Sequence, residues 1–324
     1  MAETLNIQHS TFNVQPVFIA GPTAVGKSEI ALQLAEQIGG EIISVDSMQV
    51  YRGLDIGTAK PSSTDRARVP HHLIDICELN ETFDASRFIR LAQKAVEEIQ
   101  SRKKVPIFCG GTGLYFKAFL SGLGEAPSAN PELRAELENL PFEILLSELR
   151  ERDAEAYEKI DKQNPRRVIR AVEVIRLTGK KFSEQRAEWK TEVGSQKSEV
   201  RSFFVLTRSP GDLHVRINTR VDEMFSRGLV DETRKLLKHG LEQNQTAMQA
   251  IGYRQVVEHL RGERNLPETI DLVKIKTRQF AKRQLTWFRR QLAPEWIELT
   301  KDETTEEALA KIVKTHNATN AASL

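Results

Sequence analysis

The chain has 324 residues, 40% of them hydrophobic and 28% charged, and a formal net charge of +2, which is typical of a globular protein of about two domains. Its two cysteines exclude a disulfide framework and a cysteine-based zinc site, and no apolar run reaches the length of a membrane span. We therefore expect a cytoplasmic protein without membrane contact, in which any nucleic-acid-binding surface must come from local clusters of cations.

The first predicted element follows a mostly polar leader, residues 1–16. Four apolar residues at Val17–Ala20 predict a short buried strand, and the apolar spacing in residues 29–38 predicts an amphipathic helix. Between them stands the motif G-x-x-x-x-G-K-S, in which glycines let backbone N–H groups surround an anion and the lysine adds a full positive charge. The sequence therefore predicts a polyphosphate-binding loop, with the serine as a ligand of Mg²⁺, made of Gly21, Pro22, Thr23, Ala24, Val25, Gly26, Lys27 and Ser28.

Two further strands are predicted after this loop, at Glu41–Val45 and Val105–Cys109, with a helix over Phe83–Gln100 before the second of them. The stretches 53–61 and 70–76 contain only short apolar pieces and are predicted as loops. Strands that alternate with helices predict a parallel α/β sheet, and ligands of such sheets bind beyond the carboxyl ends of the strands.

Two polar residues follow these strands, at the sheet edge where the phosphate loop is also expected. Asp46 can accept a proton from an incoming nucleophile, although an aspartate is equally suited to hold a turn. Thr112 lies in a Gly-rich bend and can contact a substrate, or cap the helix expected from Leu114. The adjacent His71 and His72 lack the usual helical spacing of metal ligands, and we expect them to be structural.

The middle of the chain has a different pattern. Residues 123–199 show only helical segments, rich in Glu and Arg as solvated helices are, and a strand returns at Ser202–Thr207. We therefore predict an α/β, P-loop NTPase-like core with a parallel sheet, made of residues 17–122 and 200–324, and an inserted all-helical domain, residues 123–199.

One helix of the insertion is strongly basic at its start. Asn164 is the predicted N-cap and Pro165 occupies the first turn. Arg166 and Arg170 are four residues apart and share a face, with Arg167 beside them. This face suits contact with nucleic-acid phosphates, or it is an ordinary solvated charged face.

The C-terminal part of the core is predicted to be mainly helical. Its helices are expected at Leu213–Lys238, Ala250–Leu260, Pro267–Leu292 and Thr305–Thr315, with a last strand at Trp296–Leu299. From Lys274 to Leu292 the sequence has seven cations and no acid, with Phe280, Trp287 and Phe288 interleaved. RNA supplies phosphates for such cations and bases for stacking, although the aromatic residues equally suit a protein core.

Seven stretches of the chain match the motifs of one known family, in the family's order. They read GPTAVGKS (21–28), SVDSMQVYRGLDIGTAKP (44–61), PHHLIDI (70–76), GGTGLYFKA (110–118), NPRRVIRAVEV (164–174), AIGYRQ (250–255) and TRQFAKRQLTWFRR (277–290). Through them the sequence resembles the bacterial tRNA dimethylallyltransferases, also called tRNA isopentenyl-pyrophosphate transferases. The motifs are spread over most of the chain and are together far more specific than the phosphate loop alone.

The resemblance implies transfer of the dimethylallyl group of dimethylallyl diphosphate to the exocyclic N6 amine of adenine at tRNA position 37, with release of pyrophosphate assisted by Mg²⁺. It implies that Asp46 is the base at this amine and that Thr112 contacts the target nucleotide or its phosphate. It also implies that the diphosphate is held by Thr23, Lys27, Ser28 and Arg254, since a guanidinium can bind two phosphate oxygens at once. The implied catalytic residues are therefore Asp46, Thr112 and Arg254.

The partner that the resemblance implies is the anticodon stem-loop of tRNA, bound by a monomer. A single-stranded loop suits the reaction because the target adenine must leave its stack to reach the site. The implied tRNA contacts are Asp46, Ser47, Met48, Gln49, Thr112, Arg166, Arg167, Val168, Ile169, Arg170, Gln249, Ala250, Ile251, Gly252, Tyr253, Arg254, Lys282, Arg283, Gln284, Leu285, Thr286, Trp287, Phe288 and Arg289.

The chain departs from the family pattern in the insertion. The segment between Leu133 and Tyr157 is somewhat short, and DKQNPRR (161–167) replaces the more usual HPNDPQR. These departures concern the tRNA contacts and not the chemistry. No cysteine follows Cys109, so the chain matches the bacterial form and not the eukaryotic relatives that carry a C-terminal zinc finger.

Two other functions use the same phosphate loop. One is an ATP-dependent kinase of a small molecule or nucleoside, and the other is a nucleotide-switched binding protein without chemistry of its own. The uninterrupted basic helix disfavours the kinase, which has no need of it. Asp46 and the Gly-rich bend at Thr112 both indicate a second substrate, which disfavours the switch.

Overall fold

A computed structural model describes residues 15–123, 126–127, 129–185 and 202–321. Most of the predicted polar leader, residues 1–14, and the predicted loop at 191–199 lie outside the described residues. The described residues form two compact units. One contains the residues up to Lys117 together with those from 202 onward, and the other extends from Ala118 to residue 185.

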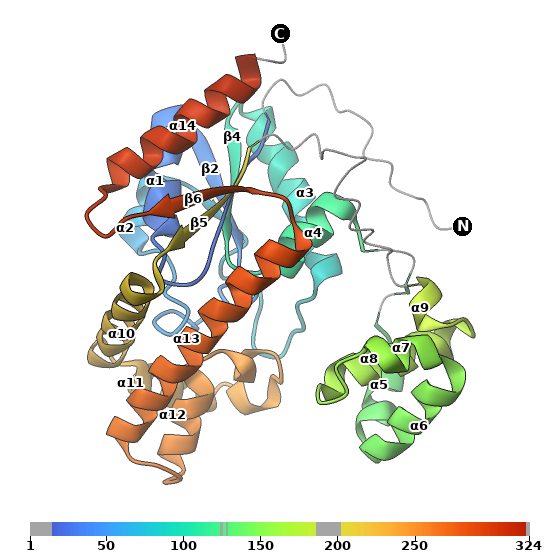
Figure 1. Ribbon diagram of the computed structural model, residues 1–324. Coiled ribbons are helices and arrows are strands. Elements are labelled where there is room, and N and C mark those ends of the chain that lie inside the picture. The colour runs from blue at the N-terminus through green and yellow to red at the C-terminus, as the bar shows by residue number, and fades with distance from the viewer. Residues whose placement is uncertain (1–14, 124–125, 128, 186–201, 322–324) are drawn as a thin grey trace. The chain divides into compact units, whose positions relative to one another are not determined.

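The first unit is built on a six-stranded parallel sheet, which confirms the predicted α/β fold (Figure 1). The strand order is β3-β2-β4-β1-β5-β6, and all neighbouring pairs are parallel. The strands are β1 (Val17–Ala20), β2 (Gly40–Val45), β3 (His71–His72), β4 (Val105–Gly110), β5 (Phe203–Arg208) and β6 (Glu295–Leu299). Because the strands are parallel, the loops after β1, β2 and β4 all leave the same edge of the sheet.

Helices surround this sheet, and some of them lie beyond its edge (Figure 1). They are α1 (Lys27–Ile38), α2 (Ser63–Arg68), α3 (Ala85–Ser101), α4 (Gly113–Ser121), α10 (Pro210–Ser226), α11 (Leu229–Leu237), α12 (Tyr253–Leu260), α13 (Leu266–Gln291) and α14 (Thr305–Ala321), with two 3₁₀ turns at Leu241–Gln243 and Ala247–Gln249. Successive side chains of β1 point to opposite faces of the sheet and so belong to two parts of the core. Ile19 packs with α1 and α14, which lie side by side in Figure 1. Phe18 points the other way and stacks on Phe108, with ring centroids 4.7 Å apart.

A short strand and a short helix were not predicted from the sequence. The predicted loops at 53–61 and 70–76 flank α2, and His71 and His72 form β3 beside β2. His72 Nε2 lies 2.7 Å from a carboxylate oxygen of the buried Glu41, and His71 Nδ1 lies 2.7 Å from the carbonyl oxygen of Val69. Both histidines therefore have structural contacts.

Two predicted helices have different bounds because glycines interrupt them. The helix expected at 213–238 is two helices, α10 and α11, because Gly228 adopts a φ of +97° between them. The helix expected from Ala250 begins only at Tyr253, because Gly252 has a φ of +103°. Only glycine adopts such backbone angles without strain.

The second unit contains helices and, within the described part of residues 118–185, no strand. The helices are α5 (Pro131–Glu138), α6 (Phe142–Arg152), α7 (Ala154–Lys159), α8 (Pro165–Thr178) and α9 (Phe182–Gln185). Its core is centred on the buried face of α8, with Val168, Val172 and Ile175. Asn164 precedes α8 as predicted, but its side chain makes no capping hydrogen bond.

A buried carboxylate connects α5 and α8 of this unit. The Glu173 side chain is fully buried and accepts hydrogen bonds from the Asn130 amide at 2.9 Å and from Arg134 and Arg170 at 2.7 Å each. Burial raises the pKa of Glu173, but the hydrogen bonds from Arg170, the Asn130 amide and Arg134 outweigh this effect, so the pKa is lowered overall. The ionised carboxylate therefore stabilises the unit.

We expect Glu173→Gln to lower the free energy of unfolding by about 3 kcal/mol at pH 7, since it removes one partner of a buried ion pair. Because the folded pKa is depressed, the contribution is present above the unfolded value of about 4.3 and is lost as the pH falls through the folded value. Urea unfolding at pH 7 and at pH 3 measures both effects, and the difference between variant and wild type should shrink at pH 3.

The matched control is Glu155→Gln, which removes an exposed i,i+4 pair with Lys159. It should cost less than about 1 kcal/mol. Equal losses in the two variants, or a Glu173→Gln effect that does not depend on pH, would contradict this role of Glu173.

Candidate active site

The loop between β1 and α1 has the shape of an anion cradle. Gly21 has a φ of +152°, and a Cβ atom there would lie 2.8 Å from the carbonyl oxygen of Leu206, so glycine is required. Gly26 follows with a φ of +108° just before α1. The Lys27 ammonium folds back over the loop and donates to the carbonyl oxygen of Pro22 at 3.2 Å.

Two arginines orient the peptide groups of this loop. Arg216 Nε donates to the Ala24 carbonyl and Arg208 Nε to the Val25 carbonyl, each at 2.9 Å. In a planar trans peptide the N–H points opposite to the C=O. The N–H groups of Val25 and Gly26 therefore face away from the arginines, and neither takes part in a backbone–backbone hydrogen bond in the described chain. They are available to an anion.

Two cations share this site with Asp46. Burial lowers the pKa of Lys27, an effect that the charge of Arg220 reinforces and that Cys109 and Asp46 oppose. Burial also lowers the pKa of Arg220, against the influence of Asp46. Among the buried polar atoms of the described residues, Arg220 Nε is one of the few without a hydrogen-bond partner. A buried, unpaired donor beside a second cation is a site that an anion would complete.

The cysteine at this site is not a nucleophile at neutral pH. Cys109 is buried behind the loop, and its Sγ atom lies 3.7 Å from the carbonyl oxygen of Lys27. Burial raises the pKa of its thiol to about 11. The thiol therefore stays protonated, which excludes thiolate chemistry here.

Asp46 holds a turn with one carboxylate oxygen and leaves the other free. Its Oδ1 atom accepts the amides of Met48 at 2.8 Å and Gln49 at 3.2 Å. In the described part of the chain, Oδ2 has no hydrogen-bond partner. The two roles considered from the sequence are therefore compatible, because the turn fixes the carboxylate while Oδ2 is available to accept a proton.

The loops at this edge are tied together by side chains. The Thr112 hydroxyl accepts the amide of Ser47 at 3.2 Å, so it joins the loop after β2 instead of capping α4. The side chain of Gln284, on α13, makes two hydrogen bonds. Its Oε1 atom accepts the backbone N–H of Thr23 at 3.0 Å, and its Nε2 atom donates to the Gly111 carbonyl at 2.9 Å. Gln284 thus connects the phosphate loop with the Gly-rich bend after β4.

The glycines of that bend are explained by α13. A Cβ atom at Gly111 would lie 2.2 Å from Gln284 Nε2, and one at Gly113 would lie 2.1 Å from the Trp287 ring. Only a backbone without side chains allows α13 to approach this closely. The basic helix is therefore part of the wall of the site.

The cations of α13 are partly paired. Lys274 forms a 2.6 Å ion pair with Asp222, so an acid on another helix pairs with one cation of this segment. Lys276, Lys282 and Arg290 form no ion pair with any described residue, and Arg289 lies 5.6 Å from the Trp296 ring centroid. Phe288 is fully buried and belongs to the core, whereas Phe280 is 38% exposed, so a stacking role of Phe280 stays a prediction.

The structure does not join Arg254 to the phosphate loop by any hydrogen bond. Its side chain is 64% exposed and pairs with Glu258 on the same helix at 3.1 Å. Its role at the diphosphate stays a prediction. Sequence reasoning missed Arg216 and Arg220, although their i,i+4 spacing on α10 is the kind of signal that identified Arg166 and Arg170.

The expected tRNA contacts divide by exposure, and their roles stay predictions. The side chains of Val168, Ile169, Ala250, Tyr253, Gln284 and Phe288 are buried, so they pack inside the protein. Arg166, Arg167, Gln249, Lys282, Arg283 and Arg289 are exposed. Arg170 is paired with Glu173 and bonded to the Pro127 carbonyl. The exposed group contains the residues that can reach a partner directly.

Two features are absent from the described residues. No group of three or more His, Cys, Asp or Glu side chains is placed to hold a metal ion. No helix has the length and apolar composition needed to cross a membrane. Any metal ion at the loop would therefore depend on a bound ligand for most of its coordination.

Comparison with known proteins gives a consistent result. A protein-family model described as IPP transferase matches residues 49–291. The tRNA dimethylallyltransferase of Thermotoga petrophila is 42% identical over 301 residues, covering 91% of this chain and 96% of that protein. A tRNA dimethylallyltransferase of Citrifermentans bemidjiense is 43% identical over 292 residues, covering 90% of this chain and 94% of that protein.

Solved structures agree with the sequence relatives. The tRNA isopentenylpyrophosphate transferase of Bacillus halodurans is 38% identical with a TM-score of 0.69, covering 95% of this chain and 98% of that one. A eukaryotic dimethylallyltransferase acting on tRNA is 27% identical with a TM-score of 0.75, covering 94% of this chain and 80% of that one. The likeness extends over nearly the whole chain.

We expect Arg220→Met to weaken pyrophosphate binding at least about tenfold, since a charged hydrogen bond contributes about 1.5–3 kcal/mol. Isothermal titration calorimetry with pyrophosphate and Mg²⁺ measures the dissociation constant. The matched control is Arg234→Met, which removes an exposed arginine paired with Asp231 on α11. A dissociation constant within twofold of wild type for Arg220→Met would show that Arg220 does not contact the anion.

Proposed function

The chain belongs to the IPP transferase family, and on that premise we propose that it moves the dimethylallyl group of dimethylallyl diphosphate to N6 of adenine at tRNA position 37. It is a prenyltransferase that modifies tRNA, as its curated relatives are, and these comparisons do not favour the kinase alternative. The observation that carries the proposal is an anion cradle with Lys27 and Arg220 beside the free oxygen of Asp46.

The donor binds through its diphosphate. The N–H groups of Val25 and Gly26, the Lys27 ammonium and the unpaired Nε of Arg220 form a complementary set for the two phosphates. Thr23 and Ser28 complete the loop, and Arg254 is retained as a further candidate contact. The cations stabilise the negative charge that grows on the leaving group as the C–O bond breaks.

Asp46 acts as the base. The N6 lone pair of adenine is delocalised into the ring, so the amine is a weak nucleophile and must lose a proton as the bond forms. The bond from N6 to C1 of the dimethylallyl group forms, the C1–O bond breaks, pyrophosphate leaves and Oδ2 of Asp46 takes the proton. The Thr112 hydroxyl supports this geometry by accepting the amide of Ser47, and we propose that Thr112 also contacts the target nucleotide.

The residues at the loop fit Mg²⁺ in the manner of other phosphate loops. Ser28 is exposed at the start of α1 and offers one hydroxyl ligand, while the described chain supplies no carboxylate cluster. Mg²⁺ in such sites is held mainly by substrate phosphates and water. When bound, the ion neutralises charge on the diphosphate and makes pyrophosphate a better leaving group.

The partner is the anticodon stem-loop of tRNA. The exposed cations of α13, Lys282, Arg283 and Arg289, lie on the helix that forms a wall of the site through Gln284 and Trp287. Such cations bind phosphates without reading sequence. The insertion, residues 123–199, serves as a second tRNA-contacting domain through Arg166 and Arg167. We further propose that the enzyme is a cytoplasmic monomer.

Incubation with Mg²⁺, unmodified tRNA and either dimethylallyl diphosphate or ATP tests the reaction. The RNA is then digested and its nucleosides are weighed by mass spectrometry. A dimethylallyl adenosine is expected with the isoprenoid donor only. ATP consumption without any prenylated nucleoside would contradict the proposal and favour the kinase alternative.

We expect Asp46→Ala to lower kcat by at least about a hundredfold, because general-base catalysis contributes 10²–10⁴-fold. The affinity for tRNA, measured by filter binding, should change less than about twofold, since one carboxylate is a small part of a phosphate-dominated interface. The control is Asp302→Ala, an exposed residue between β6 and α14. Unchanged turnover in Asp46→Ala would remove Asp46 as the base.

A further inference from the structure

The loop Leu54–Lys60, between β2 and α2, is anchored at both ends. Leu54 is fully buried. The Lys60 side chain is 2% exposed, and its ammonium donates to the Tyr51 carbonyl at 2.6 Å and to the carboxylates of Asp55 and Asp75 at 2.7 Å and 2.5 Å. These anchors leave the position of the middle, Ile56–Gly57, to be set by other contacts.

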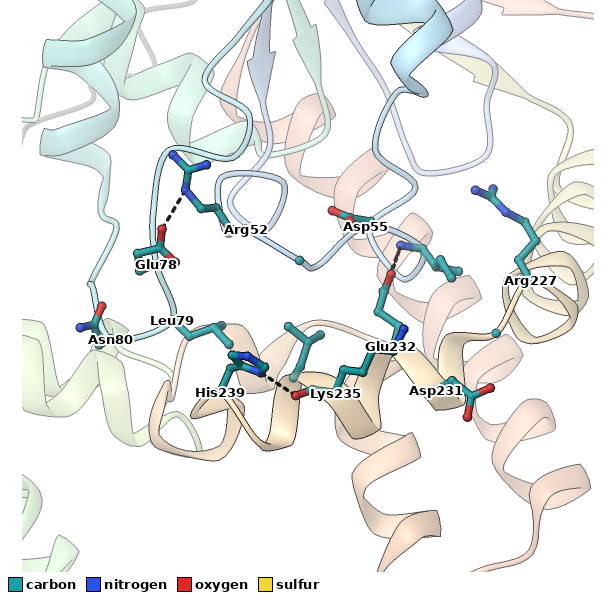
Figure 2. Close-up of a pocket in the computed structure, with 14 residues that line it drawn as sticks. Arg52, Asp55, Glu78, Leu79, Asn80, Arg227, Asp231, Glu232, Lys235 and His239 are labelled. Atoms are coloured by element: carbon teal, nitrogen blue, oxygen red, sulfur yellow. Dashed lines mark hydrogen bonds and ion pairs between the residues drawn. The ribbon is translucent and has the colours of Figure 1, made fainter.

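On one face of the loop, no side chain of the described residues packs against Ile56–Gly57 closely enough to fix its position. The outer face of the loop lines a cavity of about 830 Å³, whose opposite wall is α11 and the segment 78–80. Figure 2 shows Asp55 on the loop, with Glu232 reaching toward the loop from α11. With open space on this face, polar contacts must hold the loop.

Glu232 supplies those contacts. Its carboxylate accepts the amide of Ile56 on both oxygens, at 3.0 and 2.9 Å, and the amide of Gly57 at 3.4 Å. It also accepts the hydroxyl of Tyr253 at 2.5 Å, and that hydroxyl accepts from Gly57 N at 3.1 Å. We call Glu232 and Tyr253 together the carboxylate clamp.

The clamp gives a structural reason for two residues of the family motifs, Gly57 and Tyr253. A Cβ atom at Gly57 would lie 2.5 Å from the Tyr253 ring, so glycine is required for the loop to approach it. Tyr253 is fully buried, and burial together with the charge of Glu232 raises its pKa, so its hydroxyl keeps the proton that it donates. The GLDIGTAKP and AIGYRQ stretches thus meet at one carboxylate.

The side chain of Gln49 connects the clamped loop to Asp46. The amide nitrogen of the Gln49 side chain donates to the carbonyls of Thr58 at 3.1 Å and Ala59 at 3.4 Å. Its amide oxygen accepts the Ser44 hydroxyl at 2.9 Å. The backbone N–H of the same residue donates to Asp46 Oδ1 at 3.2 Å. A shift of the loop therefore moves the amide that orients the carboxylate.

We propose that Glu232, together with Tyr253, is a positioning residue for Asp46, acting through the Leu54–Lys60 loop and Gln49. The proposal rests on the proposed function, since it assumes that Asp46 is the base. In this proposal the clamp acts on the loop and not on the reacting atoms. It fixes the loop whose carbonyls hold Gln49, and so keeps Asp46 Oδ2 aimed at the nucleophile.

Glu232→Ala should lower kcat by about tenfold or more, the effect of losing charged hydrogen bonds, while KM for tRNA and for the donor changes less than about twofold. Glu232→Gln keeps one acceptor oxygen for the loop amides and should recover part of kcat. Because Tyr253→Phe removes a contact of the same clamp, the double variant with Glu232→Ala should be no slower than Glu232→Ala alone. The control is Asp231→Asn, which changes the neighbouring exposed carboxylate, paired with Arg234 and not bonded to the loop.

Amide hydrogen exchange provides a readout that does not depend on activity. Exchange at Ile56 and Gly57 should be faster in Glu232→Ala than in wild type and unchanged in Asp231→Asn, while the core strands keep their protection. Unchanged exchange at these two amides overturns the clamp. Fast exchange with unchanged kcat overturns the positioning role. A wild-type enzyme without prenyl transfer would refute the proposed function, whereas the exchange result would still decide the clamp.

Discussion

The site depends on two buried cations that have too few partners of their own. Burial disfavours the charged forms of both Lys27 and Arg220 and lowers both pKa values, and the charge of Arg220 adds to this cost at Lys27. Asp46 offsets only part of it. A diphosphate, cradled by the loop amides, would supply the missing negative charge, and the same charges stabilise it as it leaves. The loop amides and the two cations therefore serve both to bind the donor and to activate its leaving group.

The loops around this pair of cations are held by a few crosslinking side chains. Gln284 joins the phosphate loop to the bend after β4, and Thr112 joins that bend to the loop that carries Asp46. Glu232 holds the next loop along the chain. Since Gln284 lies on the basic helix α13, the element expected to meet tRNA is also a wall of the donor site.

The sequence was informative where the signal is local. The phosphate loop, five of the six strands and the turn at Asp46 follow from short patterns, and the family follows from motifs over the whole chain. The partners of those residues depend on tertiary contacts: Arg216 on α10, Gln284 on α13 and Glu232 on α11 are far in the sequence from the loops they hold. β3 was missed because two histidines beside Glu41 carry no apolar pattern, and the break at Gly228 because apolar periodicity continues across it.

The most direct test of this account is the free energy of unfolding of wild type and Arg220→Met, each with and without pyrophosphate and Mg²⁺. If Arg220 is an uncompensated buried charge in the free protein, its removal should leave the free protein at least as stable as wild type. Pyrophosphate should then stabilise wild type much more than the variant. A free variant that is clearly less stable than wild type, yet gains as much from pyrophosphate, would contradict the account.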